Sequence, residues 1–290
     1  MSVETLPLGE SFTWRYPESL QRQGHQRQSY DAEIRWDCFG EGPPVILCHG
    51  TPWSSFVWRR IVHELAPHWS VYVWDMVGYG RSDKPDGDVS LRTQGELLAA
   101  LIEEWKLETP HVVAHDVGGA VALRSHLLHA TPFASLTMID VVALRPWGSP
   151  FFKLVAEHAD VFASLPPNLH RVLVREYISG ASHQGLAADV LDALVEPWID
   201  AGQAAFYRQI AQADERFTAE LEGRFGEIKI PTLIVWGTND EWIPVDRADR
   251  LAAAIAGSRK HLIRGAGHLV QEDAPAELAR VLAEWLHTHR

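Results

Sequence analysis

The sequence predicts an α/β protein with a mostly parallel central sheet, helices on both faces and a helical segment inserted late in the sheet. Short runs rich in β-branched residues alternate with longer amphipathic stretches, which is typical of a parallel sheet wrapped by helices. Most of the short runs are continuously apolar, as expected of strands that are covered on both faces. The alternation breaks once, over residues 144–217, where aromatic and helical residues replace the β pattern.

The elements follow in order along the chain. An antiparallel hairpin at the sheet edge is predicted for Asp31–Gly40, before the first buried strand. Apolar β-rich runs predict strands at Pro44–Cys48, Val71–Trp74, His111–Ala114, Leu136–Val141, Thr232–Trp236 and Lys260–Ile263. Helical spacing of apolar residues predicts helices at Leu91–Trp105, Ala120–His129, Ala248–Ala256 and Pro275–His287.

These elements divide the chain into two predicted domains. Residues 1–143 and 218–290 form the α/β core, and residues 144–217 form a helical cap, or lid. An insertion between two late strands is expected to lie over the carboxyl ends of the strands, where open α/β sheets bind their ligands. We therefore expect the cap to take part in the site.

Composition limits the classes of partner. The net charge of −12 and the pI near 5.6 argue against a partner that is nucleic acid or an anionic membrane surface. Two cysteines, Cys38 and Cys48, fit a reducing compartment. We see neither a secretory signal in residues 1–21 nor an apolar run of the roughly 20 residues that a membrane-spanning helix needs. We therefore expect a cytoplasmic monomer or homodimer, whose twelve tryptophans suit a cavity for an apolar small-molecule substrate.

Polar residues follow several of the predicted strands. Asp116 follows the third buried strand, and Asp240 and His268 follow the last two. Because the carboxyl ends of parallel strands meet at one edge of a sheet, we expect these three side chains to converge. His126 and His129 lie three residues apart, but no third ligand accompanies them, and we predict no metal site.

The segment around Asp116 predicts a sharp strand-to-helix turn. Small residues flank the aspartate at Ala114, Gly118 and Gly119, as such a turn requires. At the amino end of the following helix, the free N–H groups and the helix dipole favour the ionised carboxylate. The alternative is an aspartate that only caps the helix.

With these motifs the chain resembles the α/β-hydrolase superfamily over nearly its whole length. The resemblance lies in the turn His49-Gly50-Thr51-Pro52, the loop Gly78-Tyr79-Gly80-Arg81-Ser82-Asp83, the turn around Asp116, and the order nucleophile, acid, histidine. The chain is most similar to the branch with an aspartate nucleophile, which contains the epoxide hydrolases and the haloalkane dehalogenases.

The resemblance implies a mechanism that needs no cofactor. Asp116 would displace a leaving group from a saturated carbon and form an ester. Water deprotonated by His268 would then hydrolyse this ester, with Asp240 orienting the histidine. The backbone N–H groups of Thr51 and Val117 would form the oxyanion hole. Asp140 competes with Asp240 as the acid, because some relatives place it there, but the spacing from Gly237 to Pro244 favours Asp240.

The same resemblance guides the choice between epoxides and carbon–halogen bonds. Dehalogenases typically place a tryptophan after the nucleophile and an N–H donor in the turn, where this chain has Val117 and Thr51. The segment Phe206-Tyr207-Arg208 resembles the one that carries a lid tyrosine of epoxide hydrolases, so Tyr207 is our first candidate for the acid that protonates the ring oxygen. Tyr177 and His158 are candidates for a second lid acid. We expect the pocket to be lined by His49, Pro52, Trp53, His115, Trp147 and Phe151.

The leading interpretation is an epoxide hydrolase that forms vicinal diols. The alternatives are a haloalkane dehalogenase with unusual halide donors, a relative that acts on β-lactones, and a non-catalytic small-molecule receptor on the same fold.

Overall fold

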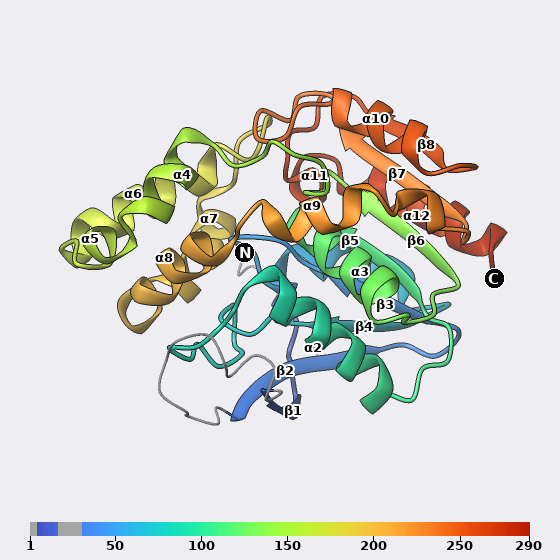
Figure 1. Ribbon diagram of the computed structural model, residues 1–290, viewed down its shortest axis with the longest axis horizontal. Coiled ribbons are helices and arrows are strands. Elements are labelled where there is room, and N and C mark those ends of the chain that lie inside the picture. Colours follow the sequence, from blue (N-terminus) through green and yellow to red (C-terminus); the bar gives the residue numbers. More distant parts are fainter. Residues whose placement is uncertain (1–4, 17–30) are drawn as a thin grey trace.

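A computed structural model describes residues 5–16 and 31–290, so part of the amino-terminal stretch considered above for a secretory signal lies outside the described residues. Its centre is an eight-stranded sheet in the order β1-β2-β4-β3-β5-β6-β7-β8 (Figure 1). The strands are β1 (Glu10–Arg15), β2 (Asp31–Phe39), β3 (Pro44–Cys48), β4 (Ser70–Trp74), β5 (His111–His115), β6 (Ser135–Ile139), β7 (Thr232–Gly237) and β8 (Arg259–Ile263). All six predicted buried strands are present within two residues of their expected bounds.

The amino-terminal edge of the sheet differs from the prediction. Asp31–Gly40 is not a hairpin by itself: β2 is one strand that pairs antiparallel with β1 on one side and with β4 on the other. The hairpin prediction was wrong because β2 finds its partners elsewhere in the chain. No strand was predicted at β1, an edge strand in which Trp14 is the one buried residue.

The strand order places the helices of the core on two faces. The chain passes from β3 to β4 in one direction across the sheet and from β4 to β5 in the other. Because such crossovers are right-handed, the connecting helices lie on opposite faces. The core helices are α1 (Arg59–Leu65), α2 (Leu91–Glu104), α3 (Val117–Leu128), α9 (Arg216–Glu222), α10 (Asp246–Ala254), α11 (Val270–Asp273) and α12 (Pro275–Thr288), with short 3₁₀ turns η1 (Ser55–Trp58) and η4 (Phe225–Glu227). Helix α2 packs against α3, and α1 packs against α12.

A second group of helices lies between β6 and β7 in the sequence. These inserted helices are α4 (Pro150–Glu157), α5 (Ala159–Ala163), α6 (Pro167–Ser179), α7 (Ala188–Val195) and α8 (Gln203–Gln212), with the turns η2 (Glu196–Trp198) and η3 (Asp200–Gly202). They gather at one side of the sheet, at the left of Figure 1. Helix α8 packs against α4 and α5, and α6 packs against α7.

Hydrogen bonds anchor the inserted helices to the core at several places, two of which bear on the position of these helices. Asp273 of α11 accepts bonds from the hydroxyl of Ser182, which follows α6, and from the backbone N–H of Gly267. Gln212 of α8 bonds the backbone of Gly87 and Val89. The first set joins the end of α6 directly to the loop that carries His268.

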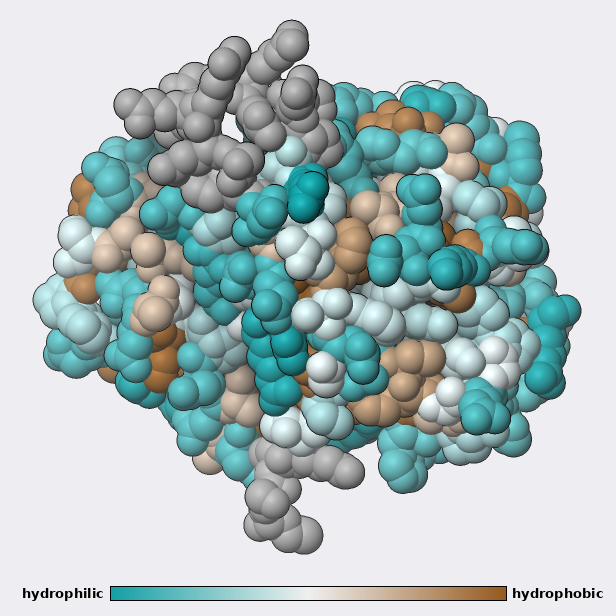
Figure 2. All heavy atoms as spheres, turned by 90° about the horizontal axis from the view of Figure 1, so that it is seen from below, coloured by the Kyte–Doolittle hydropathy of each residue, from teal (hydrophilic) through white to brown (hydrophobic). Residues whose placement is uncertain are grey.

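One face of the molecular surface is mainly hydrophilic. On the face in Figure 2, apolar residues appear in small separate groups between hydrophilic ones. Within residues 5–16 and 31–290, no helix is both long and apolar enough to span a bilayer.

Candidate active site

Asp116 occupies the turn between β5 and α3. Its φ of 53° lies in the left-handed region, which is strained for a residue with a side chain. A Cβ atom at Gly50 would overlap the Asp116 side chain, and one at Gly119 would overlap Val141. The small residues therefore give the turn the space it needs. The carboxylate makes no capping bond to α3, which argues against the interpretation as a helix cap alone.

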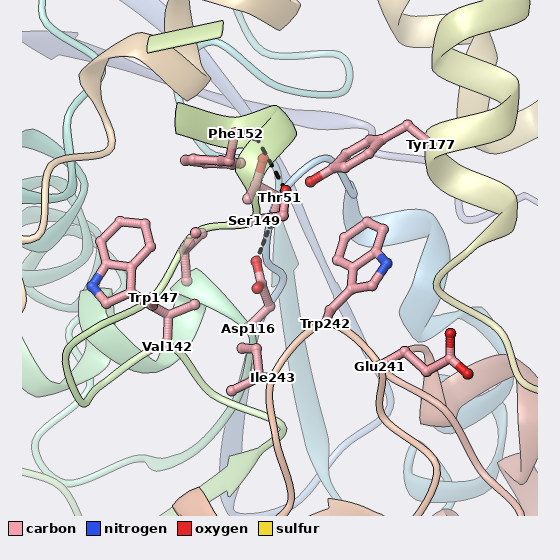
Figure 3. Close-up of a pocket in the computed structure, with 12 residues that line it drawn as sticks. Thr51, Asp116, Val142, Trp147, Ser149, Phe152, Tyr177, Glu241, Trp242 and Ile243 are labelled. Carbon is pink, nitrogen blue, oxygen red and sulfur yellow. Dashed lines mark hydrogen bonds between the residues drawn. The ribbon is translucent and has the colours of Figure 1, made fainter. Parts of the chain in front are cut away.

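The two carboxylate oxygens of Asp116 have different neighbours. Oδ1 accepts a hydrogen bond of 2.6 Å from the backbone N–H of Thr51, which is drawn in Figure 3. Oδ2 lies 3.3 Å from Nε2 of His268. The side chain is buried apart from the face that lines a cavity. Oδ1 is thus fixed by the backbone, and Oδ2 is the oxygen next to the histidine.

His268 lies between two carboxylates. Its Nδ1 is 2.9 Å from Oδ2 of Asp240, whose Oδ1 accepts the N–H groups of Trp242 and Ile243 at 2.7 and 2.9 Å. Burial lowers the pKa of His268, but the charges of Asp240 and Asp116 outweigh it, and the pKa is raised well above 6.5. These charges favour the protonated ring of His268 between the two carboxylates. The structure brings the three predicted side chains into contact.

Asp140 does not occupy the position next to the histidine. It follows β6, is fully buried, and its Oδ1 accepts the N–H of Gly237 at 2.8 Å. Its carboxyl group contacts that of Asp240. Of the two candidate acids, Asp240 is the one bonded to His268.

The groups predicted for the oxyanion hole lie beside Asp116. The Thr51 N–H already contacts Oδ1. Val117 is the first residue of α3, and the first N–H groups of a helix have no partner within it. The Thr51 hydroxyl donates to the amide oxygen of Gln209 on α8, which also accepts from the Tyr79 hydroxyl at 2.9 Å. The sequence carried no signal for Gln209, because an isolated glutamine in a helix is unremarkable.

A cavity of about 90 Å³ opens beside Asp116 (Figure 3). Its wall is mainly apolar. It is lined by Thr51, Asp116, Val117, Val142, Trp147, Gly148, Ser149, Phe152, Tyr177, Glu241, Trp242 and Ile243. In Figure 3 the Tyr177 hydroxyl points into the pocket, whereas the Glu241 carboxylate points away from it. Trp242 was missed by the sequence analysis, although its position two residues after Asp240 was a usable signal.

Five of the six predicted pocket residues do not line this cavity, and Trp147 is the exception. His49 accepts the N–H of Met76 through Nε2, and the carbonyl of Pro52 accepts the indole N–H of Trp198. Trp53 stacks behind Trp242, with ring centroids 5.6 Å apart. These residues support the wall from behind.

His115 and Phe151 also act from outside the cavity. Nε2 of His115 is 2.9 Å from the backbone carbonyl of His268. Burial, followed by the charge of His268, lowers the pKa of His115 to about 3, so the ring is neutral and donates to that carbonyl. The ring of Phe151 packs against Tyr177, with centroids 5.0 Å apart.

The prediction for the lid acids requires a correction. Tyr207 is fully buried, and its hydroxyl is 2.7 Å from Nδ1 of His170. His158 is exposed at the end of α4. Neither lines the cavity, whereas Tyr177 does. Within α8 the face that carries Tyr207 is turned toward α5 and α6, and sequence alone did not reveal this orientation.

No cluster of three or more potential metal ligands occurs among residues 5–16 and 31–290.

Comparison with known proteins places this fold in a family. The model of the alpha/beta hydrolase fold family matches residues 43–275. The chain belongs to this family.

The relatives include several kinds of hydrolase. A crystal structure of an alpha/beta hydrolase fold protein from Burkholderia ambifaria is 44% identical, with a TM-score of 0.89 over 97% of this chain and 99% of that one. Epoxide hydrolase A of Mycobacterium tuberculosis is 30% identical over 84% of this chain and 90% of its own length. Haloalkane dehalogenase 2 of Mycobacterium bovis is 26% identical over 84% of this chain and 88% of its own length.

Proposed function

We propose that this chain is a cofactor-independent hydrolase that opens an epoxide to a vicinal diol through an ester on Asp116. The observation that carries the proposal is that the two oxygens of the Asp116 carboxylate have different partners. Oδ1 is bound by the Thr51 N–H, while Oδ2 faces His268 beside a cavity that contains the Tyr177 hydroxyl. The similarity to epoxide hydrolase A supports the same reaction.

In the first step Oδ2 of Asp116 attacks a ring carbon, and the carbon–oxygen bond of the epoxide breaks. The ring oxygen takes the proton of the Tyr177 hydroxyl, and the tyrosinate recovers a proton from solvent. Burial and the charge of Asp116 raise the pKa of Tyr177, so the hydroxyl is protonated before the reaction. The product of this step is a hydroxyalkyl ester of Asp116.

In the second step the ester is hydrolysed at Cγ of Asp116. Esterification removes the negative charge of Asp116, which is one of the charges that raise the pKa of His268. The imidazole can then lose its proton and deprotonate the attacking water. Negative charge develops on Oδ1, where the N–H groups of Thr51 and Val117 stabilise it. His268 returns the proton to the departing alkoxide, then takes the proton of the Asp116 carboxylic acid that hydrolysis leaves, and the diol leaves.

The wall of the cavity favours an epoxide over a haloalkane. Halide release needs N–H donors directed at the leaving halide, and Val117 supplies none from its side chain. The indole N–H of Trp147 donates to Oγ1 of Thr218 at 2.9 Å, so it is already bonded away from the site. The aromatic walls at Trp147, Phe152 and Trp242 suit a small apolar substrate. We further propose that residues 144–217 act as the cap over this substrate.

The proposed function is tested by product analysis with the wild-type protein. Incubation with styrene oxide is expected to give the vicinal diol, and incubation with 1-bromobutane is expected to give no bromide above the rate without protein. Chromatography and a bromide electrode measure the two products. Bromide release without diol from any epoxide would assign the protein to the dehalogenases, and no product from either would favour a receptor.

A matched pair of tyrosine variants tests the acid. Tyr177→Phe is expected to lower the rate of epoxide opening by about 10²-fold or more, the scale of a general acid. Tyr207→Phe should stay close to wild-type turnover, because its hydroxyl bonds His170 outside the cavity. Single-turnover rates with styrene oxide measure both. Equal losses in the two variants, or a larger loss for Tyr207→Phe, would remove Tyr177 from the mechanism.

A further inference from the structure

We propose that Asp140 is a protonated positioning residue, which donates a hydrogen bond to the Asp240 carboxylate, so that a pair of carboxyl groups orients His268. The effect of this residue on turnover rests on the proposed function, whereas the protonation state of Asp140 can be measured independently of it.

The first argument is an unsatisfied buried oxygen. Asp140 is fully buried and its Oδ1 accepts the N–H of Gly237. Its Oδ2 is also buried and has no hydrogen-bond partner within the described part of the chain. The neighbouring polar group is the carboxyl group of Asp240. Two carboxylates cannot donate to each other, so a hydrogen bond between them requires a proton on one.

The second argument is the charge of the site. The titratable groups that act on this pair are His268 after β8 and His115 on β5, and Asp116 in turn acts on both histidines. The pKa of His115 is lowered to about 3 and that of His268 is raised well above 6.5, so the site can hold one histidine cation. If Asp140 were ionised, three buried carboxylates would surround one imidazolium, and an uncompensated buried charge is costly. With Asp140 protonated, two carboxylates remain.

The third argument identifies which member of the pair carries the proton. Asp240 accepts three N–H groups, from Trp242, Ile243 and the ring of His268, and such donors favour its charged form. Asp140 accepts one. Burial, and then the charge of Asp240, raise the pKa of Asp140 well above its usual range.

The fold builds this contact into the sheet. Strands β6 and β7 pair in parallel, and Asp140 follows β6 with a φ of 45°, which turns the chain at the point where β7 ends in Gly237. A short bond from the protonated acid to Asp240 would keep Oδ2 of Asp240 directed at Nδ1 of His268.

Two substitutions of Asp140 distinguish this arrangement from a second ionised acid. In Asp140→Asn a neutral amide donor replaces a neutral carboxylic acid donor, so the charge near His268 does not change. The titration of the His268 ring, followed by nuclear magnetic resonance, should therefore match wild type. Turnover of styrene oxide should also stay close to wild type. Asp140→Ala removes the donor and is expected to lower turnover about 10–100-fold, as loss of an outer-shell partner does. The infrared carbonyl band of a buried protonated carboxyl group should be present in wild type and absent from Asp140→Asn.

The outcomes separate the possibilities. A lower titration pH for His268 in Asp140→Asn, together with no protonated carboxyl band in wild type, would show an ionised Asp140 and overturn the proposal. Equal turnover losses in Asp140→Asn and Asp140→Ala would overturn the positioning role. If Asp140→Ala does not fold, the titration and infrared results for Asp140→Asn still decide the protonation state. If wild type turns over no epoxide, the proposed function fails while these two measurements still stand.

Discussion

His268→Ala should accumulate a covalent ester on Asp116 while its steady-state turnover of styrene oxide falls about 10²–10⁴-fold, the range for loss of a general base. The first step needs Asp116 and an acid from the cavity, and neither is removed by the substitution. The second step needs a base, and His268 is the group whose Nε2 lies beside the attacking oxygen of Asp116. Intact-mass spectrometry should show one adduct per chain with the whole mass of the epoxide, and peptide mapping should place it on Asp116.

The same variant separates the two substrate classes. With 1-bromobutane we expect no adduct, because Val117 has no side-chain N–H and the indole N–H of Trp147 is bonded to Thr218, so neither supports a departing halide. An alkyl adduct that has lost bromide, formed from the bromoalkane alone, would assign the chain to carbon–halogen hydrolysis. If an adduct forms on a different residue, Asp116 is not the nucleophile.

Asp116→Asn should abolish turnover, with a loss on the order of 10⁴–10⁶-fold, as seen when a nucleophile is removed from a hydrolase triad. The amide oxygen can still accept the Thr51 N–H, and the side chain makes no capping bond to α3, so we expect the fold to persist. The substitution removes one of the charges that raise the pKa of His268, so that pKa should fall.

Three measurements check the Asp116→Asn variant together. Diol formation gives the rate, thermal unfolding gives the stability, and magnetic resonance of the histidine ring gives the pKa. Asp160→Asn on the inserted helix α5 is a matched control, because it makes the same chemical change at an exposed position. Retained diol formation in Asp116→Asn would exclude the ester mechanism, and an unfolded variant would leave the adduct experiment with His268→Ala to decide it.

The sheet and the convergence of Asp116, Asp240 and His268 could be predicted from local sequence. Strands β3 to β7 are short, mainly apolar and bounded by turns, so their pattern needs no knowledge of the rest of the chain, whereas β8 carries a mixed pattern. Asp116, Asp240 and His268 each follow such a strand, and parallel pairing then brings them to one edge. The strand β1 and the pairing of β2 were not predictable in this way, because β1 has a single buried residue and pairing is decided between segments that are separated in the chain.

The sequence by itself determined the α/β fold, the polar residues that follow the strands, and the small residues around Asp116. These features depend on the periodicity of apolar residues and on the space that the backbone needs. Only the tertiary structure decided that Tyr177 rather than Tyr207 faces the cavity, that Trp242 lines it, and that Asp140 contacts Asp240. Each of these depends on how an inserted helix is rotated, or on which loops end side by side. These side-chain positions are decided by packing between segments that are distant in the sequence, so no local pattern in the chain predicts them.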